Sequence, residues 1–410
     1  MKTMKLTKYK LGELLDVTRG ASLSGEYFAT QGDYMRLTCG NFDYQNNCFK
    51  SNTSKDNLYY TGNFNQEYLM EKDDIITPLT EQAVGLLGST AWVPESGKYI
   101  QSQDVAKITP NEKLLDKKFC YYLISSRVVK QQLSAAAQQT KIRHTSPDKI
   151  KDCTVWIPSL EEQTKVGQFL YDIDSKIALN RQINDNLEAM ARQLYDYWFV
   201  QFDFPNEDGK PYKSSGGDMV WNERLKREIP KGWNVARIGS ILDKVVSTPR
   251  LSTNEYLSTG TFPIIDQTTD VYYAGFTNRE DALVKQIPAV VFGDHSCAVK
   301  FVNFPFARGA DGTQILLSKN ECVSTEYLYF VVQITKIAKG YARHFSFLKD
   351  QPIIIPSNRL ANKYEEVAKT LFNQITRNRE EIRSLTKQRD ELLPLLMNGQ
   401  VTVNYHLSEC

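Results

Sequence analysis

Two long stretches of the chain carry apolar residues at alternating steps of mostly four and three. Over residues 161–201 and 360–398 this spacing forms one narrow helical stripe, which is typical of a coiled-coil seam. Polar residues interrupt the stripes at Asn180, Asn184, Asn378 and Arg389. Ser159, with Glu162 three residues later, fits a capped start for the first helix. The pattern favours two helices that pair within the chain over two amphipathic helices that each cover a globular core.

The rest of the chain carries short apolar or alternating segments broken by Gly, Asn, Asp and Pro, which predict strands. Residues 117–134 and 325–338 have the period of a helix. The fold class predicted is therefore α+β, with irregular domains beside the long helices. The expected strands are 34–38, 74–77, 91–93, 105–109 and 154–157 in the first half, and 263–265, 289–292, 299–302 and 314–317 in the second.

Landmarks of the first half return in the second half. The run Lys10–Leu15 returns as Arg237–Leu242, and Val155–Ser159 returns as Ile353–Ser357, each followed by a predicted long helix. The order is thus domain, helix, domain, helix, with a period far longer than that of solenoid repeats. Residues 202–221 are rich in Asp, Gly, Pro and Ser and predict a surface linker at a domain boundary.

Composition narrows the class of protein. The 410 residues allow two or three domains, and no apolar run approaches the ~18 residues that a membrane helix needs. The net charge is +2; residues 1–160 and 222–356 each carry +3, and residues 161–201 carry −3. A polyanion should therefore meet the globular copies. Seven widely spaced cysteines without a CxxC pair, and no signal peptide, indicate a cytoplasmic protein with free thiols.

Motifs of catalysis are missing from the sequence. We find no Walker loop, Gly-x-Gly-x-x-Gly, Gly-x-Ser-x-Gly or amino-methyltransferase signature. The four histidines lack partners at metal spacing, and the pairs Asp294-His295, Asp73-Asp74 and Glu161-Glu162 are better explained as structural. We therefore expect no catalytic, metal or cofactor site. An enzyme with an unrecognised site remains an alternative.

Basic residues recur at equivalent places before the two Pro-Ser landmarks. Such side chains could contact phosphates and base edges of DNA, or form a solvated turn. A Gly-rich segment at 304–312 could reach a groove or only turn the chain. The candidate DNA-binding residues are Lys141, Arg143 and His144 in the first copy and Arg308, Lys339, Arg343 and His344 in the second.

Several motifs together make the chain resemble the specificity subunits of type I restriction-modification enzymes over nearly its whole length. They lie at Ile157–Gln163, Leu179–Asn184, Leu187–Ala191 and Trp198–Asp203, with Pro230–Trp233 at the start of the second copy. Gly293-Asp294-His295 and Ala310-Asp311-Gly312 are typical of the family's recognition domains. Ser159 stands where a second Pro is common, and Gln201 stands where Asp is common.

The resemblance implies two target recognition domains, each reading one half of a split double-stranded DNA target, separated by two long helices that form an antiparallel coiled coil. The implied domains are 1–159 and 222–357 for recognition, 160–201 and 358–410 for the helices, and 202–221 for the linker.

The resemblance also implies partners. Two methyltransferase subunits would bind the helices and restriction subunits would join them, while S-adenosylmethionine, ATP and Mg²⁺ belong to those partners. The chain itself would hold no cofactor. Another class of function fits the same architecture: a coiled-coil scaffold whose globular ends bind protein. Salt-dependent binding to duplex DNA separates the two hypotheses.

Overall fold

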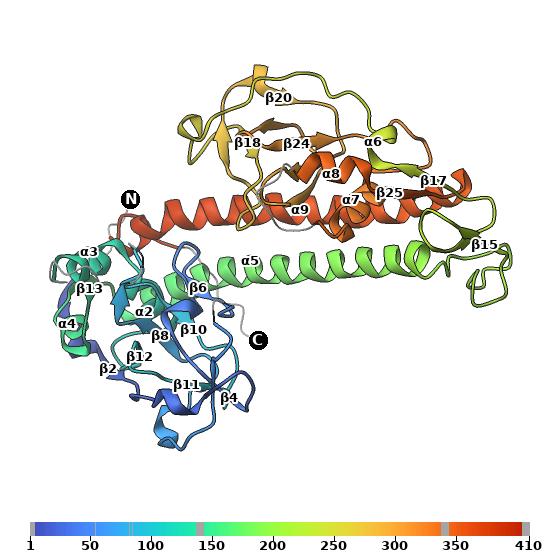
Figure 1. Ribbon diagram of the computed structural model, residues 1–410. Coiled ribbons are helices and arrows are strands. Elements are labelled where there is room, and N and C mark those ends of the chain that lie inside the picture. Colours follow the sequence, from blue (N-terminus) through green and yellow to red (C-terminus); the bar gives the residue numbers. More distant parts are fainter. Residues whose placement is uncertain are drawn as a thin grey trace. The chain divides into compact units, whose positions relative to one another are not determined.

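The computed structural model describes residues 5–53, 55–81, 83, 85–136, 143–337 and 344–403. The chain forms two compact units, one of residues 1–178 with 382–410 and the other of residues 179–381. Two long helices, α5 (Leu160–Tyr195) and α9 (Asn358–Met397), each contribute residues to both units (Figure 1). The predicted α+β class is confirmed, because each unit mixes short strands with helices.

The first unit is built from short strands and four short helices around the start of α5 and the end of α9. Its main sheet has the order β10-β8-β12-β2, and a second sheet has the order β11-β4-β7-β3. Strand β1 pairs antiparallel with β14, so the first and last strands of the copy lie together. The bounds are β1 Thr7–Lys10, β2 Leu15–Arg19, β3 Phe28–Ala29, β4 Tyr34–Arg36, β5 Phe42–Asp43, β6 Cys48–Phe49, β7 Tyr59–Tyr60, β8 Ile75–Pro78, β9 Thr80–Glu81, β10 Ala91–Trp92, β11 Tyr99–Ile100, β12 Val105–Pro110, β13 Arg143–His144, β14 Thr154–Ile157, α1 Leu11–Leu14, α2 Lys117–Ile124, α3 Arg127–Ala136 and α4 Pro147–Lys151.

The second unit repeats this plan. Its sheets have the orders β22-β21-β24 and β19-β18-β23-β20, and β17 pairs antiparallel with β25 as β1 does with β14. The bounds are β15 Met219–Asn222, β16 Arg227–Pro230, β17 Asn234–Arg237, β18 Phe262–Ile265, β19 Gly275–Thr277, β20 Leu283–Val284, β21 Ala289–Gly293, β22 Val299–Val302, β23 Phe306–Arg308, β24 Thr313–Leu316, β25 Pro352–Ile355, α6 Ile238–Ile241, α7 Thr325–Ile334 and α8 His344–Asp350.

The repeat extends to individual atoms. The main-chain nitrogen of Leu11 donates to the carbonyl of Cys153, and that of Ile238 donates to the carbonyl of Gln351, both at 2.9 Å. A Cβ at Gly12 would lie 3.1 Å from the Cβ of Lys151, and one at Gly239 would lie 3.0 Å from that of Lys349. Both glycines allow the same close approach of a short helix to its neighbour.

The two long helices pack against each other within each unit. In the second unit Asn180 bonds to Glu381 and Asn184 bonds to Asn378. Residue numbers therefore increase along α5 in the direction in which they decrease along α9, so the two helices run antiparallel. In the first unit Asp174 pairs with Arg389, which is 8% exposed. The predicted polar interruptions of the seam therefore lie at the helix contact, where a buried Asn can fix register.

Each unit has a large apolar core that includes its parts of the long helices. In the first unit Val166 and Leu170 of α5 and Leu396 of α9 join the core around α2. In the second unit Tyr195, Trp198 and Tyr364 are buried with α7 and the sheet that contains β21. Apolar residues of each long helix thus also belong to the globular core of the unit in which they lie.

The structure corrects three expectations about elements. The helix expected over 117–134 breaks into α2 and α3, because the Ser125 hydroxyl donates to the carbonyls of Tyr121 and Tyr122 and ends the first helix. Helix α7 ends at Ile334, before a Thr335 with extended backbone, instead of continuing to residue 338. The first long helix ends at Tyr195 and continues as one π-helical turn, Asp196–Val200.

The segment 202–221 is more than the surface linker that its composition predicts. Phe202 and Phe204 are buried, and Phe204 stacks between Tyr212 and Trp233. Strand β15 begins at Met219 and pairs with β16. The turn-forming residues that suggested a loop are present, but the aromatic residues between them anchor the segment in the second unit's core.

Candidate nucleic-acid interface

In the second unit, parallel strands bring two loops to one sheet edge. Strands β18 and β23 pair in parallel, with Ile265 opposite Arg308, so the residues that follow them leave from the same edge. These residues are Asp266–Asp270 after β18 and the Gly-rich loop Gly309–Gly312 after β23. A third segment, Asp294–Ala298 after β21, joins them, because the Asp294 nitrogen donates to the Gly312 carbonyl at 2.7 Å.

Gln267 ties the three segments together. Its Nε2 donates to the Asp311 carbonyl at 2.9 Å, and its Oε1 accepts from the His295 nitrogen at 3.2 Å. Its own carbonyl accepts from the Ser296 hydroxyl at 2.6 Å. Gly312 has a φ of +87° and a Cβ there would meet His295 and Gln267, so this position requires glycine. The cluster is thus an organised platform that leaves His295 and Asp311 exposed.

Two buried aspartates stabilise the platform through hydrogen bonds to neighbouring segments. Asp266 accepts from the nitrogen and the hydroxyl of Thr268 and from the hydroxyl of Tyr256. Asp294 accepts from the Phe345 nitrogen at 2.7 Å, which fixes the start of α8. Both carboxylates are over nine-tenths buried and fully engaged with their own chain, so their role is structural.

Arg250 is a basic residue at this platform that sequence reasoning missed. It is exposed, and its guanidinium lies 3.6 Å from the Asp311 carboxylate. The next residue, Leu251, forms a parallel bridge with Gly309, which brings Arg250 beside the loop. The counterpart in the first unit is Arg19, two residues before Ala21, which bridges in parallel to Ser102.

In the sequence, the one feature that could have pointed to Arg19 and Arg250 is that each follows the glycine of the repeated run, Gly12 or Gly239. Arg19 follows Gly12 by seven residues, whereas Arg250 follows Gly239 by eleven. Because the spacing differs, the repeat does not align them. The Arg19 Nε donates to the carbonyl of Gln103 at 2.8 Å, so both arginines contact the loop that follows the parallel strand of their own copy.

Arg308, predicted from the Gly-rich segment, turns toward its own chain. Its guanidinium donates to the Thr313 carbonyl, with the Nε at 2.8 Å, and to the Gln314 side chain at 3.4 Å. Burial lowers the pKa of this guanidinium to about 10, which leaves it charged at neutral pH. Arg308 therefore shapes the loop in this structure, and a DNA contact by its side chain stays a prediction.

The two predicted histidines occupy related backbone positions but different surroundings. His144 of β13 pairs with Thr80 of β9, and its exposed ring lies 3.3 Å from the Thr80 hydroxyl through Nδ1. The His344 nitrogen donates to the carbonyl of Asp294, but its side chain is only 5% exposed. The alternative of a solvated turn is wrong for the side chain of His344, because the core of the second unit covers it; a DNA contact by His344 stays a prediction.

The other predicted residues lie largely outside the described part. Lys141, Lys339 and Arg343 fall on residues that the structure does not describe, and of Arg143 only the backbone in β13 is described. Within the described ranges, no group of three His, Cys, Asp or Glu side chains could hold a metal ion. No helix among the described residues is long and apolar enough to cross a membrane.

The comparisons with known proteins agree with the geometry. Residues 3–189 match the family model for the type I restriction modification DNA specificity domain. The chain is similar to the specificity subunits of type I restriction-modification enzymes. The description of the family model and the names of the relatives both concern DNA specificity in these enzymes.

Three relatives illustrate the match. The MjaIX specificity subunit of Methanocaldococcus jannaschii is 25% identical, with 74% of this chain and 73% of the relative covered. The HindI specificity subunit of Haemophilus influenzae is 24% identical, with 74% and 81% covered. The crystal structure of the type I S subunit from M. genitalium shares the fold, with a TM-score of 0.60, 17% identity and 97% of both chains covered.

Proposed function

We propose that each globular copy reads one half of a bipartite double-stranded DNA target. The observation that carries this proposal is the duplication itself. Both copies close through the same pair of first and last strands, and both place an exposed or partly exposed arginine against the loop after a parallel strand. Arginine at a loop edge suits contact with phosphate or guanine. In functional terms the recognition domains are residues 1–159 and 222–357.

The remaining parts would form the frame of the subunit. We assign residues 160–201 and 358–410 to the helices and 202–221 to the connection between the copies. The cytoplasm is where we place the protein, since its proposed target is genomic DNA. The candidate contacts remain Lys141, Arg143, His144, Arg308, Lys339, Arg343 and His344, and we add Arg19, Arg250 and His295.

The same helices would dock two methyltransferase subunits, and restriction subunits would join that complex. An exposed apolar stripe supports docking in the second unit. Leu179, Ile183 and Met190 are between 37% and 55% exposed, and their spacing of four and seven residues places them on one face of α5. That face lies ~100° around the helix from Asn180 and Asn184. Large exposed apolar side chains in a row mark an interaction surface.

A domain exchange tests the reading function. Residues 222–357 are replaced by the matching domain of a relative, and methylated sites are mapped with the methyltransferase subunits present. One half of the target should change while the other half and the spacing stay. A change in both halves contradicts independent reading. Binding to duplex DNA whose affinity does not fall with salt would favour the scaffold alternative.

Docking is tested on the stripe. Replacing Leu179 and Met190 by Ser should weaken the association with methyltransferase subunits and leave DNA binding by the purified chain unchanged. Ser at the exposed Val246, which lies elsewhere in the second unit, is the matched control. Equal association of the stripe variant and the control would remove this face from the interface.

A further inference from the structure

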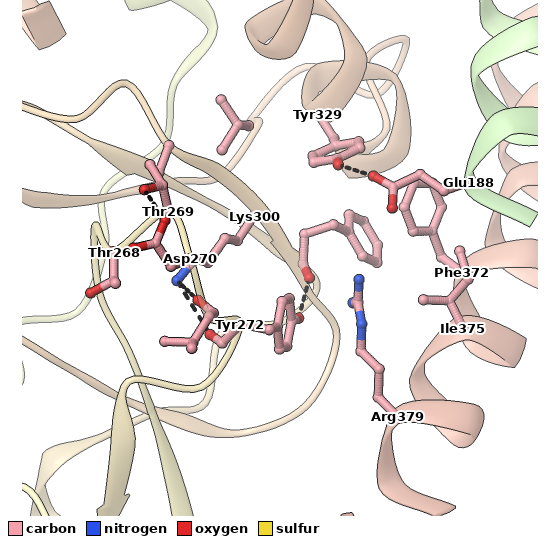
Figure 2. Close-up of a pocket in the computed structure, with 14 residues that line it drawn as sticks. Glu188, Thr268, Thr269, Asp270, Tyr272, Lys300, Tyr329, Phe372, Ile375 and Arg379 are labelled. Carbon is pink, nitrogen blue, oxygen red and sulfur yellow. Dashed lines mark hydrogen bonds between the residues drawn. The ribbon is translucent and has the colours of Figure 1, made fainter. Parts of the chain in front are cut away.

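A cavity in the second unit lies between a loop of the recognition domain and the helix α9. Its volume is about 270 Å³, and it is lined by residues of the loop 268–272, strand β22, α7, α5 and α9 (Figure 2). Two cationic side chains border it, Lys300 from β22 and Arg379 from α9. Both contact the same loop, which continues directly from the platform residue Gln267.

Lys300 is a buried cation that holds the main chain of this loop. It is 7% exposed, and its Nζ donates to the carbonyls of Val271 at 2.9 Å and Tyr272 at 3.3 Å. Burial lowers the pKa of its ammonium group. Among the described residues no carboxylate forms an ion pair with it, and Asp266 opposes this lowering only through a longer-range charge interaction. A buried ammonium bound only to neutral carbonyls is costly, so its hydrogen bonds must restrain the loop strongly.

Arg379 holds the loop from the helix side. Its guanidinium lies 3.9 Å from the centre of the Tyr272 ring, and the Tyr272 hydroxyl donates to the carbonyl of Phe301. Figure 2 shows the Arg379 side chain reaching from α9 to the tyrosine. The next residue, Tyr273, donates to Glu380 of α9 at 3.5 Å. The loop is therefore tied to α9 by two successive side chains.

The opposite end of the same loop orders the platform. Asp266 bonds to Thr268, and Gln267 bonds to the Gly-rich loop and to the segment after β21. Residues 266–273, which we name the connector, thus have one end under the candidate DNA-contacting loops and the other end on α9. Only four residues separate Gln267 from Tyr272. Because this segment is short, we expect a displacement of Tyr272 to move Gln267 as well.

We infer that Lys300 and Arg379 are positioning residues for sequence reading by the second copy, acting through the connector. This inference rests on the proposed function. Neither side chain needs to touch DNA; each fixes where Gln267 holds the Gly-rich loop. In the first copy the strand β10, which flanks β8 as β22 flanks β21, carries Trp92, which packs on Tyr121 and Tyr171. The effect should therefore be confined to one half of the target.

The experiment compares Lys300→Met and Arg379→Met in the full chain with its methyltransferase subunits. Both changes keep an apolar stem and remove the cation. Arg377→Met, on the same turn of α9 with an exposed side chain, is the matched control. Binding is measured on the mapped target, on DNA mismatched in either half, and on unrelated DNA at several salt concentrations.

We expect discrimination against mismatches in the second copy's half to fall about tenfold, within the range of one base-pair mismatch. Discrimination in the other half, binding to unrelated DNA and the salt slope should stay unchanged. Arg379→Lys, which keeps a cation over Tyr272, should restore most of the loss. A structural defect alone would lower all binding and would not be rescued in this selective way.

Unchanged discrimination in both folded variants overturns the inference, and so does an equal loss in both halves. If Lys300→Met does not fold, Arg379→Met, whose side chain is partly exposed, decides alone. Substitution of His295 and Asp311 by Ala distinguishes a failure of this inference from a failure of the proposed DNA-reading site. If these variants alter the second half and the positioning variants do not, only the inference is wrong. If they too leave both halves unaltered, the platform does not read DNA, and the inference is overturned with its proposed site.

Discussion

The side-chain amide of Asn378 donates to the side-chain oxygen of Asn184 at 2.9 Å. Both residues are over nine-tenths buried, and Asn378 also accepts from Gln374 at 2.8 Å. The antiparallel helices therefore carry a buried polar layer at their contact. Such a layer costs stability but favours one register, because any slip leaves an amide without its partner.

A single Asn184→Leu substitution should destabilise the protein more than the double substitution with Asn378→Leu. The single change removes the acceptor of the Asn378 amide in a buried place, which costs about 1–3 kcal/mol. The double change makes the layer apolar and should recover most of that loss. Urea unfolding of the four proteins in the cycle measures the coupling. Additive losses would show that the two amides do not depend on each other.

The pair Asp174–Arg389 should contribute far more stability than Asp390–Arg389. Arg389 is 8% exposed, Asp174 lies 2.7 Å from it, and Asp174 also accepts from the Tyr122 hydroxyl. Asp174→Ala leaves a buried guanidinium with less compensation, at a cost of about 2–4 kcal/mol. Asp390 is 58% exposed, and Asp390→Ala should cost under about 1 kcal/mol. Thermal unfolding compares the two variants, and equal losses would contradict this ranking.

Local periodicity was sufficient to predict the helical frame. The heptad pattern named Asn184, Asn378 and Arg389 as polar members of the seams, and the structure pairs each of them across the helices. The heptad spacing of apolar residues depends only on residues close together in the chain, so it can be recognised in a single sequence. The break at Ser125 was not predicted, because a serine within an apolar helical run does not by itself mark the end of a helix.

The platform could not be predicted in the same way. It depends on β18 and β23 lying in parallel, a pairing between segments some 40 residues apart that no local pattern specifies. Arg250 and Gln267 were missed for that reason. His344 was predicted to contact DNA because Arg343-His344 recurs at the place of Arg143-His144, and the sequence did not show that packing buries its side chain. Motifs in the sequence indicated the class of function, while contact residues followed from tertiary structure.

Cysteine reactivity should separate buried from accessible thiols. Burial raises the pKa of Cys39 and of Cys153 to about 11 each, whereas Cys297 is only partly buried. At pH 8 a thiol with that pKa is ~0.1% thiolate, the reactive form. Alkylation of Cys39 and Cys153 should be slow, and its rate should keep rising tenfold per pH unit up to about pH 10. Mass spectrometry after timed iodoacetamide treatment measures this, and rates equal to that of Cys297 would contradict it.

Two glycines should make matched probes of the two copies. A Cβ at Gly20 would lie 2.2 Å from the Gln101 carbonyl oxygen, and one at Gly309 would lie 2.1 Å from the Tyr256 hydroxyl and 2.8 Å from Ile264. Both glycines lie beside the parallel bridges that bring Arg19 and Arg250 to their loops. Alanine at Gly20 must displace the main chain of Gln101 and Ser102, and alanine at Gly309 must displace the side chains of Tyr256 and Ile264 that pack beside the loop.

We therefore expect Gly20→Ala to relax or abolish recognition of the first copy's half of the target, and Gly309→Ala that of the second. Methylation mapping with the methyltransferase subunits present measures both. Gly25→Ala, where the added Cβ meets only the ring of Phe28 at 3.9 Å, is the control and should leave both halves intact. Because Gly20 meets main chain, its substitution should also lower the unfolding temperature more than that of Gly309, which first meets a side chain. A variant that alters the half assigned to the other copy would show that the two copies do not read separately.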